Sequence, residues 1–157
     1  MTEEHRALVH YRLGEARETR EEARLLARES RWRGALNRVY YAMFYATLAL
    51  LAVRQLAASR HSGVIALFHR EFVRPGLFAR EWARYLDIAF NLRNRSDYQD
   101  FVTPDVIQIE ELLRSGWAFH HRSRATQPAA SGSMKRVGER SGYWRPIGSG
   151  RRAGDDI

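Results

Sequence analysis

The stretch "VYYAMFYATLALLAV", residues 39–53, decides the fold class of this chain. It is interrupted only by Thr47 and lies between Arg38 and Arg54. The stretch is shorter than the roughly 18 apolar residues that a membrane span requires. A helix that is apolar on nearly every side must lie at the centre of a fold or bury a second face against another subunit. We therefore expect a buried helix in a soluble protein that does not contact a membrane.

Helical patterns continue on both sides of this stretch. Across residues 1–122 the few glycines and prolines fall between segments, and no alternating run of β-branched residues indicates a strand. The sequence therefore predicts an all-α fold, a four- to five-helix up-and-down bundle. The expected helices cover residues 2–29 with Thr2 as N-cap, 32–58, 62–73 with Ser62 as N-cap, a segment starting near 79, and a last one from Pro104 to between 115 and 121.

The composition of the chain changes near Ser123. Residues 123–157 contain six glycines, many serines, seven basic residues and three acidic ones, so they carry half of the net charge of +8. We predict that residues 1–122 form the helical domain and that residues 123–157 form a disordered tail rich in Gly, Ser and Arg. Such a tail can add nonspecific attraction for RNA, although a merely solvated tail explains the same composition.

The overall charge balance names no partner. The chain has 26 Lys and Arg against 18 Asp and Glu, and Lys135 is its one lysine. An excess carried almost entirely by arginine is typical of a GC-rich coding sequence, but a positive surface still attracts nucleic acid. The absence of cysteine excludes disulfides and thiolate metal sites. Because residues 1–10 show no apolar export signal, we expect a cytoplasmic protein.

Several kinds of chemistry are not indicated by the sequence. The histidines show no metal-ligand spacing, no glycine-rich phosphate loop follows a strand, and no hydrolase nucleophile motif is present. We therefore expect no cofactor and no metal. Arg60 and His61 do stand at the start of an expected helix, where anions are favoured, but ordinary capping by Ser62 explains that pattern equally well.

The segment "LRNRSDYQDF", residues 92–101, is the strongest candidate for a site. On a helix, Arg93 and Asp97 are four residues apart and can form an ion pair, which at a surface contributes little. An arginine fixed near a helix end can instead hold a phosphate, or stabilise the charge that develops in phosphodiester cleavage. One small bundle offers few such groups, whereas a symmetric dimer brings two copies into one cleft.

Asn37 and Arg38 are further candidates because they occupy the polar end of an otherwise apolar helix, where burial would demand partners. The tyrosines that follow them, Tyr40, Tyr41 and Tyr45, are most simply interpreted as a packed core with hydroxyl groups at its rim.

Three segments in this order and spacing resemble the HEPN family, the higher eukaryotes and prokaryotes nucleotide-binding domain: "NRVYYAMFYA" (37–46), "HSGVIALFHREFV" (61–73) and "LRNRSDYQDF". The resemblance covers residues 5–115 and is strongest to the small, stand-alone prokaryotic branch. It implies a helical bundle that usually dimerises. Many members are metal-independent ribonucleases, and many prokaryotic ones are toxins or are encoded beside a minimal nucleotidyltransferase.

The family signature is an arginine followed, after four to six residues, by a histidine, and here the arginine corresponds to Arg93. The position of the histidine falls on Tyr98, Gln99 or Asp100. A tyrosine hydroxyl titrates near about 10, so Tyr98 is a poor base at neutral pH, although it can donate a hydrogen bond to a phosphate. The resemblance also implies that Tyr98 could be adenylylated, as a nearby tyrosine is in some partners of nucleotidyltransferases.

The resulting expectation is a toxin-like HEPN homodimer whose partner is a minimal nucleotidyltransferase antitoxin. It would bind RNA or nucleotide phosphate and could cut RNA without metal. One alternative is a non-catalytic nucleotide-binding or docking module, which the missing histidine favours; another is a dimerisation scaffold whose basic tail contacts nucleic acid. The candidate catalytic residues are Arg93, Asp97 and Tyr98, and the candidate binding residues are Asn37, Arg38, Arg93 and Arg95.

Overall fold

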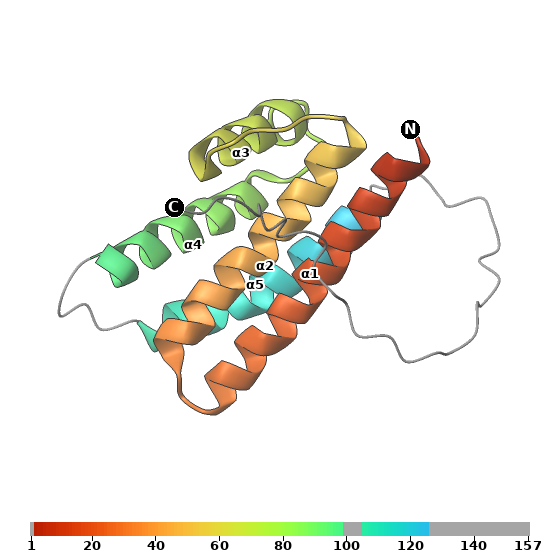
Figure 1. Ribbon diagram of the computed structural model, residues 1–157. Coiled ribbons are helices and arrows are strands. Elements are labelled where there is room, and N and C mark those ends of the chain that lie inside the picture. Colours follow the sequence, from red (N-terminus) through yellow and green to blue (C-terminus); the bar gives the residue numbers. More distant parts are fainter. Residues whose placement is uncertain (1, 99–104, 126–157) are drawn as a thin grey trace, which may run out of the picture.

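The protein is an all-α bundle, as the sequence predicts. A computed structural model describes residues 2–98 and 105–125, without the side chains of residues 97, 98 and 116–125. Figure 1 shows α1 and α2 as an antiparallel pair, with α5 behind them and α4 and α3 on the other side of α2. The elements are α1 (Glu3–Arg28), α2 (Trp32–Val53), α3 (His61–Phe68), the π-helical segment η1 (His69–Val73), α4 (Arg80–Tyr98) and α5 (Val106–Ala125).

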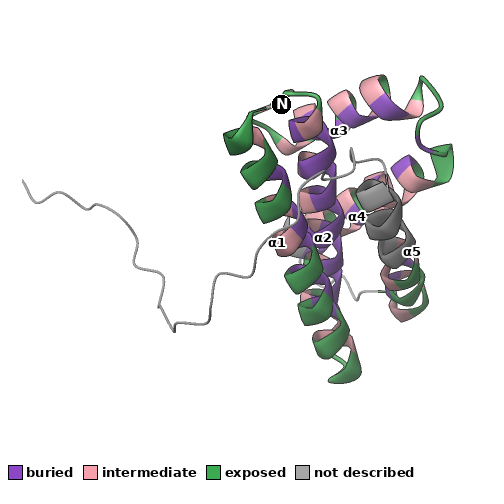
Figure 2. Ribbon diagram, turned by 90° about the vertical axis from the view of Figure 1, so that its right-hand side faces the viewer, coloured by how far each residue is buried: buried purple, intermediate pink, exposed green. Residues whose placement is uncertain are grey.

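Helix α2 lies at the centre of the bundle and contacts α1, α3, α4 and α5. Its buried side chains, such as Val39, Met43, Leu50 and Leu51, occur on most sides of the helix, which Figure 2 shows as the most buried element, but a stripe with Tyr41, Tyr45 and Leu48 is only half-buried. Most of the apolar pattern is therefore satisfied within one chain, and this stripe is the part that stays half-buried. By length and composition α2 could also cross a membrane, but 67% of its most apolar window is buried by the rest of the protein.

Helix α1 begins where the sequence predicts. The Thr2 hydroxyl accepts a hydrogen bond from the backbone N–H of His5 at 3.3 Å, which satisfies one of the unpaired donors of the first turn. The buried face of α1 is narrow, and Val9 and Leu13 form a small cluster with Ala49 and Ala52 of α2.

In both α1 and α2, the C-cap is followed by a residue with a left-handed backbone. Ser30 has φ 54° and Gln55 has φ 56°. After α2, the N–H of Gln55 bonds to the carbonyl of Ala52, and the N–H of Leu56 bonds to that of Leu51. This pair of bonds is the Schellman arrangement, which caps the last carbonyls of a helix. The helix therefore ends at Val53, and the predicted end near residue 58 is wrong. The end was missed because the left-handed residue is Gln55 and not a glycine.

Replacing Gln55 by glycine should stabilise the protein. A residue with a Cβ strains the left-handed conformation by about 1–2 kcal/mol, and the greater freedom of glycine in the unfolded chain offsets part of that gain. We expect the free energy of unfolding to rise by about 0.5–1 kcal/mol, measured by urea denaturation. Gln55→Ala keeps the Cβ and is the control; an equal gain in both variants would contradict the explanation.

The third helix starts two residues earlier than predicted, because its N-cap is Arg60 and not Ser62. Arg60 is the N-cap residue and makes no side-chain capping bond, so the prediction of Ser62 as N-cap is wrong, since Ser62 lies inside α3. The segment then widens into η1, in which the N–H of Arg74 bonds to the carbonyl of His69. The predicted stop at residues 74–76 is confirmed, and Gly76 there adopts φ 77°.

Helices α4 and α5 complete the bundle. Leu86 and Ala89 of α4 are fully buried. Asp105 accepts a hydrogen bond from the N–H of Gln108, the contact of an N-cap, so the described part of the last helix begins after the predicted Pro104. This helix continues to Ala125, beyond its predicted end. Thr103, Pro104 and most of the predicted tail lie outside the described residues.

Candidate functional site

The candidate site is built around the aromatic rings of α2. The ring of Tyr40 is completely buried, and its centroid lies 5.2 Å from that of Tyr41 and 5.8 Å from that of Phe44. Phe90 of α4 contributes a further ring 5.7 Å away. Tyr40, Tyr41 and Phe44 lie on one side of α2 because side chains three or four positions apart share a face of a helix. Together with Phe90 they form an aromatic surface, against which polar side chains of α3 and α4 pack. His61 packs on this surface from α3, and Arg93 packs on it from α4.

His61, the first residue of α3, packs on this aromatic surface. Its ring is stacked on Phe44 with 4.3 Å between centroids, and its Nδ1 lies 2.8 Å from the hydroxyl oxygen of Tyr40. The residue is only half-buried. One ring nitrogen is therefore held by Tyr40, and stacking fixes the plane of the imidazole.

Arg93 of α4 packs on the same pair of tyrosines. Its guanidinium carbon lies 6.0 Å from the ring centre of Tyr40 and 5.6 Å from that of Tyr41, within the range of cation–π attraction. Its Nη2 donates to the Tyr41 hydroxyl at 3.4 Å, and Nη1 donates to Oδ1 of Asn94 at 3.1 Å. Because Arg93 is half-buried, a positive charge is fixed at a partly accessible position beside His61.

The electrostatics of the site follow from this packing. Burial lowers the pKa of the His61 imidazole below its usual 6.5, and the positive charge of Arg93 lowers it further. Burial also raises the pKa of the Tyr40 hydroxyl well above its usual 10; Tyr41 adds to that increase and Arg93 opposes it. At neutral pH the site therefore holds a neutral imidazole, a neutral phenol and a guanidinium ion.

The folding stability should depend on the protonation of His61. The unfolded chain binds a proton near pH 6.5, whereas the folded protein resists it, so the contribution is present above that pH and is lost as the pH falls through the lower folded pKa. We expect the free energy of unfolding to decline between pH 7 and pH 5 more steeply in the wild type than in His61→Gln. Urea denaturation at several pH values measures this, and parallel curves would contradict it.

The other predicted site residues are placed differently. Arg38 is exposed, and its Nε lies 3.3 Å from a carboxylate oxygen of Glu22 on α1. Asn37 is half-buried, and Arg95 is exposed. The positions of Asp97 and Tyr98 belong to α4, but their side chains lie outside the described residues. Their proposed roles stay predictions.

His61 is the residue of the site that sequence reasoning missed. It was interpreted only as part of a helix start, because Tyr40 is 21 residues away and no local pattern links the two. The one available signal is that the stretch "RHSG" places a histidine beside an arginine directly before an apolar helix. The contact itself depends on how α3 folds back onto α2.

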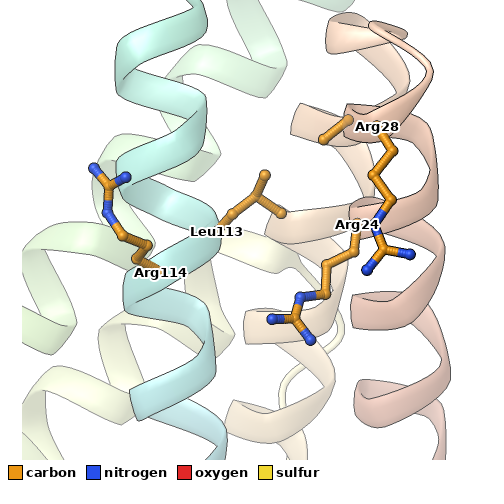
Figure 3. Close-up of a pocket in the computed structure, with 5 residues that line it drawn as sticks. Arg24, Arg28, Leu113 and Arg114 are labelled. Carbon is orange, nitrogen blue, oxygen red and sulfur yellow. The ribbon is translucent and has the colours of Figure 1, made fainter.

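Two surface pockets lie away from this cluster. One, of about 470 Å³, is lined by Arg24 and Arg28 of α1 and by Leu113 and Arg114 of α5. In Figure 3, Leu113 points toward Arg24, whereas the side chain of Arg114 points away from α1. This pocket is positively charged and therefore attractive to anions, and the side chains described around it include no aromatic ring.

The second pocket, of about 360 Å³, contains His69 and Asp87. The Nε2 of His69 lies 3.1 Å from a carboxylate oxygen of Asp87. Across the described part of the chain, no group of three His, Cys, Asp or Glu side chains could hold a metal ion.

The chain belongs to the HEPN domain family, whose model matches residues 9–122. A UPF0332 protein of Thermotoga maritima is 36% identical over 112 residues, which cover 71% of this chain and 85% of that protein. Methanocaldococcus jannaschii has two similar proteins. "Putative toxin MJ0142" is 32% identical over 90 residues, 57% of this chain and 61% of its own length. "Putative toxin MJ0605" is 35% identical over 83 residues, 53% of this chain and 62% of its own length.

Proposed function

We propose that this HEPN protein is the toxin-like half of a cytoplasmic toxin–antitoxin pair, and that it binds RNA phosphate at Arg93 and cuts the RNA without metal. The observation that carries the proposal is the guanidinium of Arg93, held over Tyr40 and Tyr41 at a half-buried position. Arginine is the side chain best suited to bidentate phosphate binding, and a pre-oriented cation costs little to reorganise in the transition state. The names of the two archaeal relatives support the toxin-like role.

Nucleic acid chemistry also suits the aromatic surroundings of Arg93. Tyr41 and Tyr45 are both half-buried, and an exposed ring edge or face can accept a base by stacking. A nucleotide bound there would place its phosphate against the guanidinium and its base against a ring. A free nucleotide would use the same contacts, so RNA and nucleotide binding are expected to compete.

The proposed assembly is a homodimer with the Arg93 sites of two copies facing one cleft, partnered by a minimal nucleotidyltransferase antitoxin. Family resemblance is the support for this assembly, because α2 buries most of its apolar side chains within one chain. The oligomeric state is tested by sedimentation, with and without the nucleotidyltransferase. A monomer at all protein concentrations would remove the shared cleft from the proposal and leave binding at one Arg93.

The activity is tested with purified protein, chelator and end-labelled RNA. Wild type should bind and cut the RNA, and Arg93→Ala should do neither well. Arg28→Ala makes the same change in charge in the separate arginine pocket and should stay close to the wild type. Equal binding by all three proteins would exclude the Arg93 site.

Removal of residues 126–157 should leave RNA binding in place. A loss of RNA binding in the truncated protein would favour the basic tail as the RNA-binding element.

A second function is favoured by one specific observation, the absence of histidine at residues 98–100. In that case the protein is a non-catalytic module that binds a nucleotide or docks a nucleotidyltransferase. It is recognised when wild type binds RNA or nucleotide more tightly than Arg93→Ala, while neither protein cuts RNA in the presence of chelator.

A further inference from the structure

Metal-independent RNA cleavage needs a group that accepts a proton. The 2′-oxygen loses its proton as it attacks the adjacent phosphorus, the bond from phosphorus to the 5′-oxygen breaks, and that oxygen must gain a proton. The products are a 2′,3′-cyclic phosphate and a 5′-hydroxyl. Arg93 cannot accept the proton because a guanidinium stays charged. Tyr40 cannot supply an anion at neutral pH, because burial raises the pKa of its hydroxyl.

The structure places one group with the required chemistry beside Arg93. His61 and Arg93 come from different helices but contact the same two rings, since the His61 ring lies 5.9 Å from those of both Tyr40 and Tyr41. The charge of Arg93 also reaches the imidazole. Within the described residues, the groups facing His61 are Tyr40 and Tyr41 from α2 and Arg93 from α4. None of them is a carboxylate that would keep the ring protonated.

We propose that His61 is the catalytic base of the Arg93 site, oriented by the hydroxyl of Tyr40, in place of the histidine that residues 98–100 lack. The assignment rests on the proposed ribonuclease function. When Nδ1–H donates to the Tyr40 oxygen, Nε2 carries the lone pair that accepts the 2′ proton; the resulting imidazolium then donates that proton to the leaving 5′-oxygen. Stacking on Phe44 holds the ring in place during both transfers.

The protonation state of His61 is suitable for this role. Its lowered pKa keeps most of the imidazole neutral at pH 7, which is the form a base needs. A phosphate bound at Arg93 partly cancels the positive charge there, so the pKa of His61 should rise when RNA is bound. The bound state therefore brings the pKa closer to the working pH, where proton transfer in both directions is most effective.

The test compares single-turnover cleavage by wild type, His61→Asn and Tyr40→Phe. Asparagine places an amide near the Tyr40 hydroxyl but has nothing at the Nε2 position. We expect cleavage to fall by about 10²–10⁴-fold in His61→Asn, with RNA affinity changed less than about threefold. Tyr40 is a positioning residue, so Tyr40→Phe should lower the rate less. His69→Asn, a half-buried histidine paired with Asp87, is the matched control and should cut normally.

A pH profile separates a catalytic role from a structural one. In the wild type, the rate should fall tenfold per pH unit below the pKa of His61. In Tyr40→Phe, the pH at which this fall begins should shift. In His61→Asn, the residual cleavage rate should no longer fall in this pH range. Added imidazole should partly restore cleavage by His61→Ala. If His61→Asn cuts RNA normally while Arg93→Ala does not cut, the assignment of His61 is overturned and the ribonuclease function is not. Wild-type protein that binds RNA without cutting it overturns both the assignment and the ribonuclease function.

Discussion

Exchanging Arg93 for lysine is expected to lower RNA affinity by about tenfold to a hundredfold, although the charge is unchanged. The guanidinium lies over the rings of Tyr40 and Tyr41 and donates to the Tyr41 hydroxyl through Nη2. A lysine ammonium has no planar fork to bind two phosphate oxygens and stacks poorly on aromatic rings. Hydrogen bonds to charged groups each contribute about 1.5–3 kcal/mol, so losing one accounts for the expected change.

Filter binding of labelled RNA at fixed salt measures the effect. Arg28→Lys provides the control because Arg28 lines the separate pocket between α1 and α5, and it should bind RNA like the wild type. If Arg93→Lys binds as tightly as the wild type, the site recognises only a positive charge, and the stacked geometry has no role in binding.

The second large effect concerns stability. Phe68→Ala is expected to lower the free energy of unfolding by about 3–5 kcal/mol. Phe68 is completely buried and forms a cluster with Phe72 and Phe78, whose ring centres lie 6.0 Å and 5.5 Å from its own. Removing the ring leaves a cavity between α3, η1 and the segment before α4. Domains of this size are usually stable by only about 5–15 kcal/mol, so the variant should lose a large share of the total stability.

Urea denaturation monitored by circular dichroism gives the comparison. Leu25→Ala removes an apolar side chain that is 58% exposed and should cost less than about 0.5 kcal/mol. Similar losses in the two variants would mean that α3 is not part of the cooperative core. Because His61 begins α3, Phe68→Ala should also weaken the catalytic arrangement proposed here.

The helices were predictable because their patterns are local. The apolar run at residues 39–53 indicated a central helix, Thr2 marked the start of the first helix, and residues 74–76 marked the end of the third segment; the structure confirms each. The errors lie where a weak local preference was overruled. Gln55 takes a left-handed conformation usually reserved for glycine, and Ser62 does not cap α3.

The site was predictable only in part. Arg93 was singled out because an arginine near a helix end can hold a phosphate and because it corresponds to the arginine of a family signature. The structure adds the two tyrosines on which it packs. His61 could not be found in this way, since its contacts with Tyr40 and Phe44 join residues 21 and 17 positions apart through the fold of α3 onto α2. Contacts between residues so far apart in the chain leave no periodic pattern in the sequence. Only the three-dimensional structure shows that the imidazole of His61 and the guanidinium of Arg93 pack on the same two tyrosines.

The narrow face of α1 has a consequence for the dynamics of the protein. Its buried apolar residues are one valine, one leucine and two alanines, so little hydrophobic surface holds this helix, whereas α2 buries large side chains along its whole length. Amide protons of α1 should therefore exchange with solvent through partial openings that leave the other helices folded. Such an opening would uncover the side of α2 that α1 covers, while the cluster of Tyr40, His61 and Arg93 is held by α2, α3 and α4.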